Sequence, residues 1–211
     1  MPILVIGGHT RNVGKTSVVA GLIAALPSFH WTALKITQHR HGVCSTHGGA
    51  CDCATADHSW AISEEKDRSG GSDTSRFLVA GAEHAWWVRT EPGRLAAAMP
   101  RIRKILASTQ NAIIESNSIL RFAKPDLYLT VLDPRTADFK PSAQTYLHRA
   151  DALLLHAVEN SQGSAWKRVS LNPVIDRPMF TIHPPDYVTP EIVEFVRTRL
   201  TSRPASAHHK P

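Results

Sequence analysis

The sequence is poor in cysteine and has neither a long apolar run nor a cluster of arginines. Its three cysteines are an odd number, lie between residues 44 and 53, and do not form the paired framework typical of small secreted proteins. No segment approaches the roughly 20 apolar residues that cross a bilayer. The N-terminus enters an apolar segment directly, without a charged and cleavable leader. We therefore expect a cytoplasmic protein that is not bound to a membrane.

The chain is basic, but its positive charge is dispersed. Lysine and arginine total 24 against 18 aspartates and glutamates, which gives a net charge of +6 and a pI near 9.5. Such a balance suits polyanionic partners in general. The alternation of aromatic and basic residues that binds single strands is missing. We expect nucleotides, and not nucleic acids, to be the anionic ligands.

The length and composition are those of one α/β domain. The chain has 211 residues and a mass of 23.2 kDa, and 42% hydrophobic residues are enough for a sizeable core. Strand-like and helical segments alternate along it. This alternation predicts a three-layer α/β fold with a mainly parallel central sheet and helices on both faces. We expect a single domain over residues 1–201 and a disordered tail over 202–211.

A glycine-bearing loop near the N-terminus, residues 7–17, reads Gly-Gly-His-Thr-Arg-Asn-Val-Gly-Lys-Thr-Ser. It lies between an apolar strand at 3–6 and an apolar helical segment at 18–26. Such a loop presents backbone N–H groups and a helix N-terminus to a phosphate. In this arrangement Lys15 reaches the β- and γ-phosphates, and the hydroxyl of Thr16 binds Mg²⁺. The segment is therefore predicted to be a P-loop that binds Mg²⁺ with GTP or ATP.

The spacing of this loop is one residue longer than usual. His9 stands where a glycine separated from Gly14 by four residues is expected, and the nearest glycine is Gly8. The longer spacing, with Thr10 and the run 12–16, resembles the loop of dethiobiotin synthetase and its relatives in the SIMIBI class of P-loop proteins. The residues expected to contact the nucleotide are Gly8, Thr10, Asn12, Val13, Gly14, Lys15, Thr16 and Ser17, with Lys35 from the next strand.

The next predicted strand, residues 31–37, contains Lys35 and ends in a basic, histidine-rich cluster at 38–41. Ligands of doubly wound sheets bind at the carboxyl ends of the strands. Lys35 and this cluster are therefore placed where phosphates or a substrate bind. A solvated polar loop explains the cluster equally well.

An insertion at about residues 39–70 interrupts the alternation of strands and helices. Small polar residues and histidine dominate residues 42–72, and the only regular element expected there is a short turn at 56–62. Three thiolates are available from Cys44, Cys51 and Cys53. We expect them to bind Zn²⁺ or an iron–sulfur cluster, with unmetalled surface thiols as the alternative. The fourth ligand is taken to be His41, with His39, His47 and His58 as alternatives.

Two acidic residues stand where a P-loop protein needs carboxylates. Asp73 begins a predicted helix that ends at Gly81, and it is interpreted either as the helix cap or as a catalytic group. Glu115 lies near the end of the buried strand 111–117, where a Walker B-type carboxylate holds Mg²⁺ or orients the attacking water. A structural hydrogen-bond acceptor is the alternative for Glu115. The candidate catalytic residues are Lys15, Asp73 and Glu115.

The rest of the chain continues the alternation. Further strands are expected at 85–90, 125–134, 152–157 and 179–183, and helices at 92–107, 142–149 and 189–200. Pro100 is expected to kink or split the first of these helices. In SIMIBI proteins the loops after the late strands approach the nucleotide, which makes Asp133, Lys140 and Asn160 candidate contacts.

The segment from Lys35 to Ala82 carries two motifs in order. Lys-x3-His-x-His follows the second strand, and Asp-Thr-x5-Ala-Gly-Ala begins at Asp73. The segment is similar to molybdopterin-guanine dinucleotide biosynthesis protein B, the MobB family, with Ser72 in place of a lysine and Glu115-Ser116 in place of Glu-Gly. The resemblance covers most of the first 130 residues. It implies GTP as the nucleotide, a homodimer, and a partner enzyme of molybdenum-cofactor biosynthesis that makes the guanine dinucleotide cofactor.

These observations predict a slow Mg²⁺-dependent NTPase in molybdenum-cofactor guanylylation or a related cofactor pathway. Two alternatives stay open. A ligase or kinase similar to dethiobiotin synthetase, with its acceptor near Lys35, explains the loop spacing equally well. A nucleotide-dependent metal switch gives the cysteines of the insertion a use.

Overall fold

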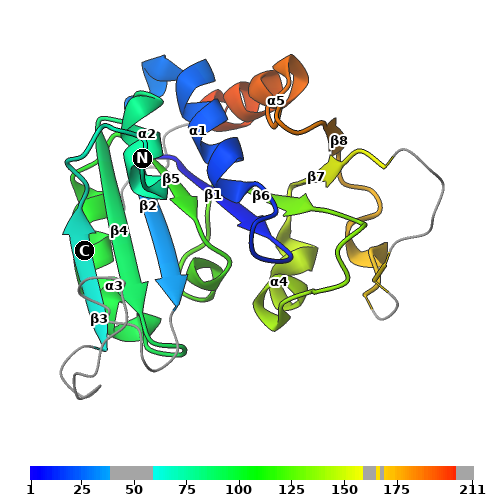
Figure 1. Cartoon of the computed structure of the whole chain (residues 1–211), viewed down its shortest axis with the longest axis horizontal. Helices are drawn as coiled ribbons and strands as arrows, with labels where there is room; N and C mark the ends of the chain where they lie inside the picture. Colours follow the sequence, from blue (N-terminus) through cyan, green and yellow to red (C-terminus); the bar gives the residue numbers. More distant parts are fainter. Residues whose placement is uncertain (39–58, 159–164, 167–168, 203–211) are drawn as a thin grey trace.

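The computed structural model describes residues 1–38, 59–158, 165–166 and 169–202 (Figure 1). The described residues form an eight-stranded sheet with the strand order β3-β4-β2-β5-β1-β6-β7-β8. Every pairing in it is parallel except that of β3 with β4. The prediction of an α/β fold with a mainly parallel sheet between two layers of helices is confirmed.

The strands are β1 (Ile3–Gly8), β2 (Trp31–Gln38), β3 (Trp60–Glu64), β4 (His84–Thr90), β5 (Asn111–Glu115), β6 (Leu127–Leu132), β7 (Ala152–His156) and β8 (Met179–Ile182). The helices are α1 (Lys15–Ala25), α2 (Asp73–Val79), α3 (Leu95–Ala107), α4 (Pro141–Tyr146) and α5 (Pro190–Thr201). Short 3-10 turns are η1 (Pro27–Phe29), η3 (Ser118–Arg121), η4 (Leu147–Arg149) and η5 (Asn172–Val174). Within the described ranges, no helix combines the length and the apolar character needed to cross a bilayer.

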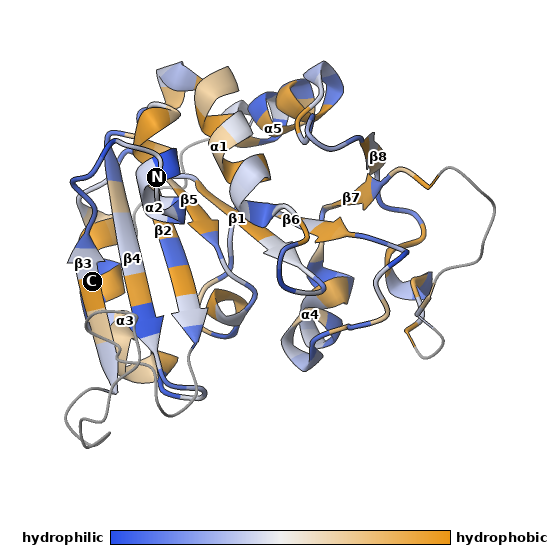
Figure 2. Ribbon diagram, viewed as in Figure 1, coloured by the Kyte–Doolittle hydropathy of each residue, from blue (hydrophilic) through white to orange (hydrophobic). Residues whose placement is uncertain are grey.

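Two hydrophobic cores lie on the two faces of the sheet. On one face α1, α2 and α5 pack against the strands through buried side chains such as Leu22, Phe77 and Val196. On the other face α3 and η3 pack through Ile102 and Ile119. Figure 2 shows apolar residues concentrated along the strands between these layers. The central strands are therefore held from both sides.

The sequence predicts the strands β1, β5 and β6 correctly, because both faces of these strands are buried. Strands covered on two faces are near-continuous apolar runs and do not alternate with polar residues. β1 pairs with both neighbours, so that Ile6 stands opposite Glu115 of β5 and Leu129 of β6. The other predicted elements also appear within a few residues of their expected bounds.

One strand was not expected. The turn predicted at 56–62 is wrong over its last three residues, because Trp60–Glu64 forms β3, an antiparallel edge strand paired with β4. The strand is short and half-exposed, so its sequence lacks the apolar run of a central strand. Ile62 packs against the core formed by α3, and this long-range contact has no local signal.

Of the two effects predicted for Pro100, the split is wrong, since α3 runs as one helix from Leu95 to Ala107 with Pro100 inside it. Pro100 and Ala96, whose carbonyl group loses its helical hydrogen bond to the missing N–H, are both exposed. Water can therefore satisfy that carbonyl group. The buried face of the helix packs on the core on both sides of Pro100, through Met99 and Ile102.

The parallel arrangement gathers the ends of several strands at one edge of the sheet. β1 ends there at Gly8, β2 at Gln38, β5 at Glu115 and β7 at His156. In open α/β sheets, ligands bind outside this edge. The segments that carry the predicted site residues therefore meet at the edge that the fold class uses for binding.

Candidate nucleotide-phosphate site

The loop from Gly8 to Gly14 has the backbone of an anion-binding turn. Asn12 and Gly14 have positive φ values of 57° and 93°, and Gly14 is the N-cap of α1. The first turn of α1 contains no acidic residue. A helix N-terminus without an acidic neighbour leaves its positive end free to attract an anion.

Asn117, which the sequence reasoning missed, anchors the start of this loop. Its Nδ2 donates to the carbonyl oxygen of Gly8 over 2.8 Å, and its Oδ1 accepts from the Gly8 N–H over 3.0 Å. A Cβ on the preceding Gly7 would lie 2.3 Å from the same Oδ1. The only sequence signal for this role is an amide side chain two residues after the end of a buried strand.

His9, the departure from the usual spacing, is fully buried. Its ring lies 5.3 Å from that of Phe139 and 5.1 Å from that of Trp166, centre to centre. Burial lowers the pKa of His9, which favours the neutral ring. The His9 N–H donates to Val131 of the neighbouring strand β6 over 3.2 Å. The residue at the usual glycine position thus packs its ring against two aromatic side chains and hydrogen-bonds to β6 through its backbone.

Lys15 folds back on the loop. Its Nζ donates to the carbonyl oxygen of Thr10 over 2.7 Å. Burial lowers the pKa of Lys15 to about 8, although the charge of Glu115 opposes this shift. An anion placed beside the ammonium group would stabilise its charged form.

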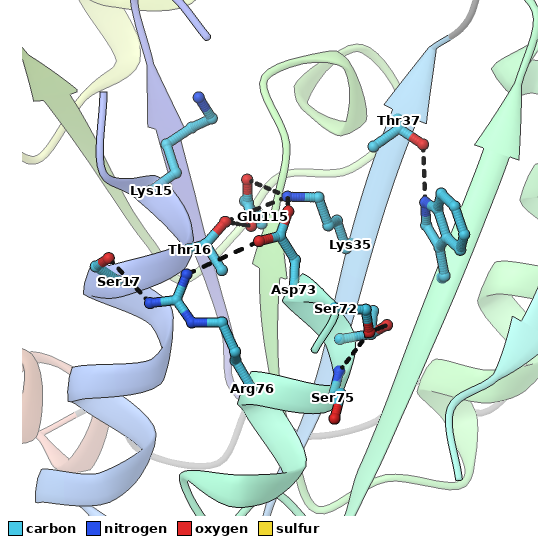
Figure 3. A network of polar contacts seen from close by, with 12 residues as sticks. Lys15, Thr16, Ser17, Lys35, Thr37, Ser72, Asp73, Ser75, Arg76 and Glu115 are labelled. Atoms are coloured by element: carbon cyan, nitrogen blue, oxygen red, sulfur yellow. Dashed lines mark hydrogen bonds and ion pairs between the residues drawn. The ribbon is translucent and has the colours of Figure 1, made fainter. Parts of the chain in front are cut away.

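Four side chains from four different elements meet next to the loop (Figure 3). The Nζ of Lys35 lies 2.5 Å from Oδ2 of Asp73, 2.9 Å from Oε1 of Glu115 and 3.2 Å from Oγ1 of Thr16. Thr16 also donates from Oγ1 to Oε2 of Glu115 over 2.8 Å. The Glu115 side chain is only 6% exposed, and the ammonium group of Lys35 supplies a positive counter-charge beside it.

The oxygens in this group fit a magnesium ion. Thr16, Asp73 and Glu115 offer one hydroxyl and two carboxylates, which are the hard oxygen ligands that Mg²⁺ takes in nucleotide sites. A cation, the ammonium group of Lys35, already stands among them. The donor set therefore suits a positively charged occupant.

The interpretation of Asp73 as a helix cap is wrong. Ser72 is the N-cap of α2, and its Oγ accepts from the N–H of Ser75 over 3.0 Å. Asp73 is the first residue of the helix, and its carboxylate contacts Lys35 instead. Serine at an N-cap leaves the following acidic residue free to turn towards another partner.

Arg76 is a second residue that the sequence reasoning missed. Its Nη2 donates to Oγ of Ser17 over 3.2 Å, and its Nη1 lies 3.9 Å from Oδ1 of Asp73 (Figure 3). It therefore links the first turn of α1 to that of α2. Its position three residues after Asp73 on one helix is the only sequence signal.

His156, at the end of β7, and Tyr187, in the segment between β8 and α5, contact the loop from the other side. The Nε2–H of His156 donates to the carbonyl oxygen of Val13 over 3.0 Å. The ring of Tyr187 contacts that of His156, and a Cβ on Gly14 would lie only 2.0 Å from Cε1 of Tyr187. Tyr187 was missed because it belongs to no motif.

Asp133 is one of the three residues after the later strands that were predicted to contact the nucleotide, and it pairs with Arg135. Its two carboxylate oxygens accept from Nε and Nη2 of Arg135 over 2.8 and 3.0 Å. These hydrogen bonds lower the pKa of Asp133. Lys140 lies beside the loop, and Asn160 falls outside the described residues.

The predicted thiolate site also falls outside the described residues. Its ligands Cys44, Cys51 and Cys53, and the histidines His39, His41, His47 and His58, all lie within 39–58. In the part of the chain that the structure describes, no group of three or more cysteine, histidine, aspartate or glutamate residues is arranged to hold a metal ion.

The strand order, together with the P-loop between β1 and α1, defines the fold of the P-loop NTPases. HypB from Helicobacter pylori, solved in complex with nickel, has a similar fold. The TM-score is 0.50 and the identity 14%, over 96% of this chain and 89% of HypB. No protein-family model matches the chain, and no curated protein matches it significantly.

A second solved structure is LpxK from Aquifex aeolicus, in its apo form in complex with ATP. The TM-score is 0.42 and the identity 18%. The match covers 86% of this chain and 53% of LpxK, so that this chain spans about half the length of that protein.

Proposed function

We propose that this protein binds a nucleoside triphosphate with Mg²⁺ at the P-loop and hydrolyses it slowly. The observation that carries the proposal is the meeting of Thr16, Lys35, Asp73 and Glu115 beside the loop that holds Lys15. These residues come from separate elements and together supply a phosphate-binding cation, a hydroxyl and two carboxylates. A phosphoryl-transfer site needs little more, because its catalysis is mostly positioning and electrostatics.

Each side chain has a role in this proposal. The amides of the loop residues Gly8, Thr10, Asn12, Val13, Gly14, Lys15, Thr16 and Ser17 surround the phosphates. Lys15 binds the β- and γ-phosphates, and Thr16 and Glu115 hold Mg²⁺. Asp73 or Glu115 orients the attacking water, and Lys35 offsets the charge of the terminal phosphate. Magnesium, when bound, stabilises the charge that develops on the phosphate oxygens.

The narrower part of the proposal concerns the pathway. The two motifs that resemble the MobB family, Lys-x3-His-x-His and Asp-Thr-x5-Ala-Gly-Ala, begin at Lys35 and Asp73, which form an ion pair of 2.5 Å. Two segments that resemble one family thus meet in one site. We propose on this basis that the nucleotide is GTP, and that a homodimer serves an enzyme of molybdenum-cofactor guanylylation.

A metal-dependent switch is the second candidate function. The presence of Cys44, Cys51 and Cys53 favours it, because these cysteines have no role in the proposed nucleotide site. The metal content of the purified protein distinguishes the two functions. Zinc, iron or nickel in stoichiometric amount supports the switch, and metal-free protein with full nucleotide affinity removes that support.

Calorimetry with ATP and GTP in the presence of Mg²⁺ tests the proposal, on protein purified without chelator whose zinc, iron and nickel content is measured. We expect one binding site per chain, preference for GTP, and dependence on Mg²⁺. Preference for ATP moves the assignment to the kinase or ligase alternative. Absence of binding by both nucleotides refutes the proposed function.

Replacing Lys35 by methionine is expected to strengthen the binding of free Mn²⁺ by about tenfold or more. The substitution removes the ammonium group and leaves the buried Glu115 without it, so that a divalent ion becomes the preferred counter-charge. Equilibrium binding followed by the Mn²⁺ resonance signal measures this without nucleotide. Lys66→Met is the matched control, because Lys66 is exposed and also contacts a carboxylate, that of Glu64. Unchanged Mn²⁺ affinity in Lys35→Met contradicts the placement of the magnesium site.

A further inference from the structure

The loop that follows β6 is fastened to the P-loop at two consecutive residues. The N–H of Lys140 donates to the carbonyl oxygen of His9 over 2.8 Å. The hydroxyl of Thr10 donates to a carboxylate oxygen of Asp138. The backbone of Lys140 is therefore held directly beside the start of the phosphate-binding loop.

His9 adds aromatic packing to this attachment. Its ring packs between Phe139, the residue before Lys140, and Trp166. Trp166 packs edge-on against Phe139 and donates from Nε1 to the carbonyl oxygen of Thr136 over 2.7 Å. A glycine at position 9 would remove this aromatic contact. His9, the unusual residue of the P-loop, therefore helps to fix the position of Lys140 through its contact with Phe139.

Lys140 lies close enough to the two other lysines for their charges to act on one another. It is half-buried, and burial lowers its pKa; the charges of Arg11 and Lys35 lower it further, while Asp138 and Glu115 oppose the shift. Lys140 in turn contributes to the lowered pKa of Lys15. The ammonium groups of Lys15, Lys35 and Lys140 are therefore near enough to repel one another.

Two of these three lysines already have partners. Lys35 contacts two carboxylates, and Lys15 donates to a backbone carbonyl group. Within the described part of the chain, the ammonium group of Lys140 makes no hydrogen bond and no ion pair. Holding several positive charges close together is unfavourable unless an anion joins them. The arrangement therefore favours an anion that reaches Lys140 from the P-loop.

We infer that Lys140 binds the terminal phosphate of the nucleoside triphosphate and makes the site prefer a triphosphate to a diphosphate. This inference rests on the proposed function, because the P-loop must hold the rest of the nucleotide. Lys35 approaches from the β2 and β5 side of β1, and Lys140 approaches from the β6 side. The terminal phosphate, which carries the largest share of the charge, is thereby held between cations from both sides.

Calorimetry on the purified full chain tests the role of Lys140. The probes are the β,γ-imido analogues of ATP and GTP and the matching diphosphates, each with Mg²⁺. Lys140→Ala is expected to weaken triphosphate binding by about tenfold and to leave diphosphate binding within a factor of about two. Lys140→Arg, which keeps the charge, is expected to retain most of the triphosphate affinity. Lys124→Ala is the control, since Lys124 is exposed and precedes the start of β6 at the opposite edge of the sheet.

The possible results separate the two proposals. Equal weakening of triphosphate and diphosphate binding by Lys140→Ala overturns the selective role, and so does the absence of any weakening. In both cases wild-type binding still supports the proposed function. If the wild-type chain binds none of the probes, the proposed function and the role of Lys140 fall together. Lys140→Gln, with thermal unfolding measured alongside, repeats the test with a longer polar side chain should the alanine variant fold poorly.

Discussion

Lys15→Ala is expected to lower nucleotide affinity by about 100-fold, the loss of roughly 3 kcal/mol that follows removal of a strong charge-assisted contact. Lys15 is half-buried, and its hydrogen bond to the Thr10 carbonyl oxygen keeps its ammonium group beside the loop. Among the described residues, the first turn of α1 contains no other lysine or arginine, so the variant loses the one cation that this turn contributes to the phosphates. Calorimetry with the preferred triphosphate and Mg²⁺ measures the effect.

The control for this prediction is Lys104→Ala, which removes the same charge from an exposed position in the last turn of α3. It should leave nucleotide affinity unchanged. Lys15→Ala should unfold at a temperature close to that of the wild type, because Lys15 forms no ion pair in the described structure. Affinity of Lys15→Ala within a factor of about three of the wild-type value would rule out the P-loop assignment.

Glu115→Gln is expected to slow hydrolysis by about 100-fold while weakening triphosphate binding by less than about tenfold. Glutamine has nearly the same shape and can still accept from the Thr16 hydroxyl. It lacks the negative charge that holds a divalent cation and orients water. Phosphate release under saturating nucleotide and equilibrium binding of the triphosphate measure the two quantities separately.

Glu64→Gln is the matched control for Glu115→Gln. Glu64 also contacts two basic side chains, those of Lys66 and His84, but it lies on the edge strand β3. Its replacement should leave hydrolysis unchanged. If Glu115→Gln turns over nucleotide at the wild-type rate, Glu115 is a structural acceptor for Thr16 and Lys35. The ion pair of Lys35 with Asp73 gives the variant a remaining partner for the buried ammonium group.

Much of the fold can be predicted because its signals are local. The apolar run of β1, the glycines that follow and the helical face of α1 occupy neighbouring segments of the chain. β3 lacks such a signal, since its place depends on pairing with β4 and on a contact between Ile62 and the α3 core. The uninterrupted α3 likewise depends on packing that a local rule for proline does not contain.

The residues of the candidate site could be named from the sequence, but the contacts between them could not. Lys35, Asp73 and Glu115 each follow from a strand end or a motif. Their meeting requires that β2, β5 and β1 be neighbours in the sheet, and strand order is a property of the whole chain. Asn117 and Tyr187 act through contacts with individual glycines of the loop, and residues of this kind form no motif in the sequence.

The contacts of His156 and Tyr187 with the P-loop have a consequence for biosynthesis. Residues near the start of the chain complete their surroundings only when residues near its end have arrived. At typical rates of about 5 to 20 residues per second, translation of the intervening segment takes roughly ten seconds or longer. During that time the phosphate-binding loop of the nascent chain lacks its contacts with His156 of β7 and with Tyr187. A ribosome-bound chain therefore acquires a finished nucleotide site only after Tyr187 has emerged.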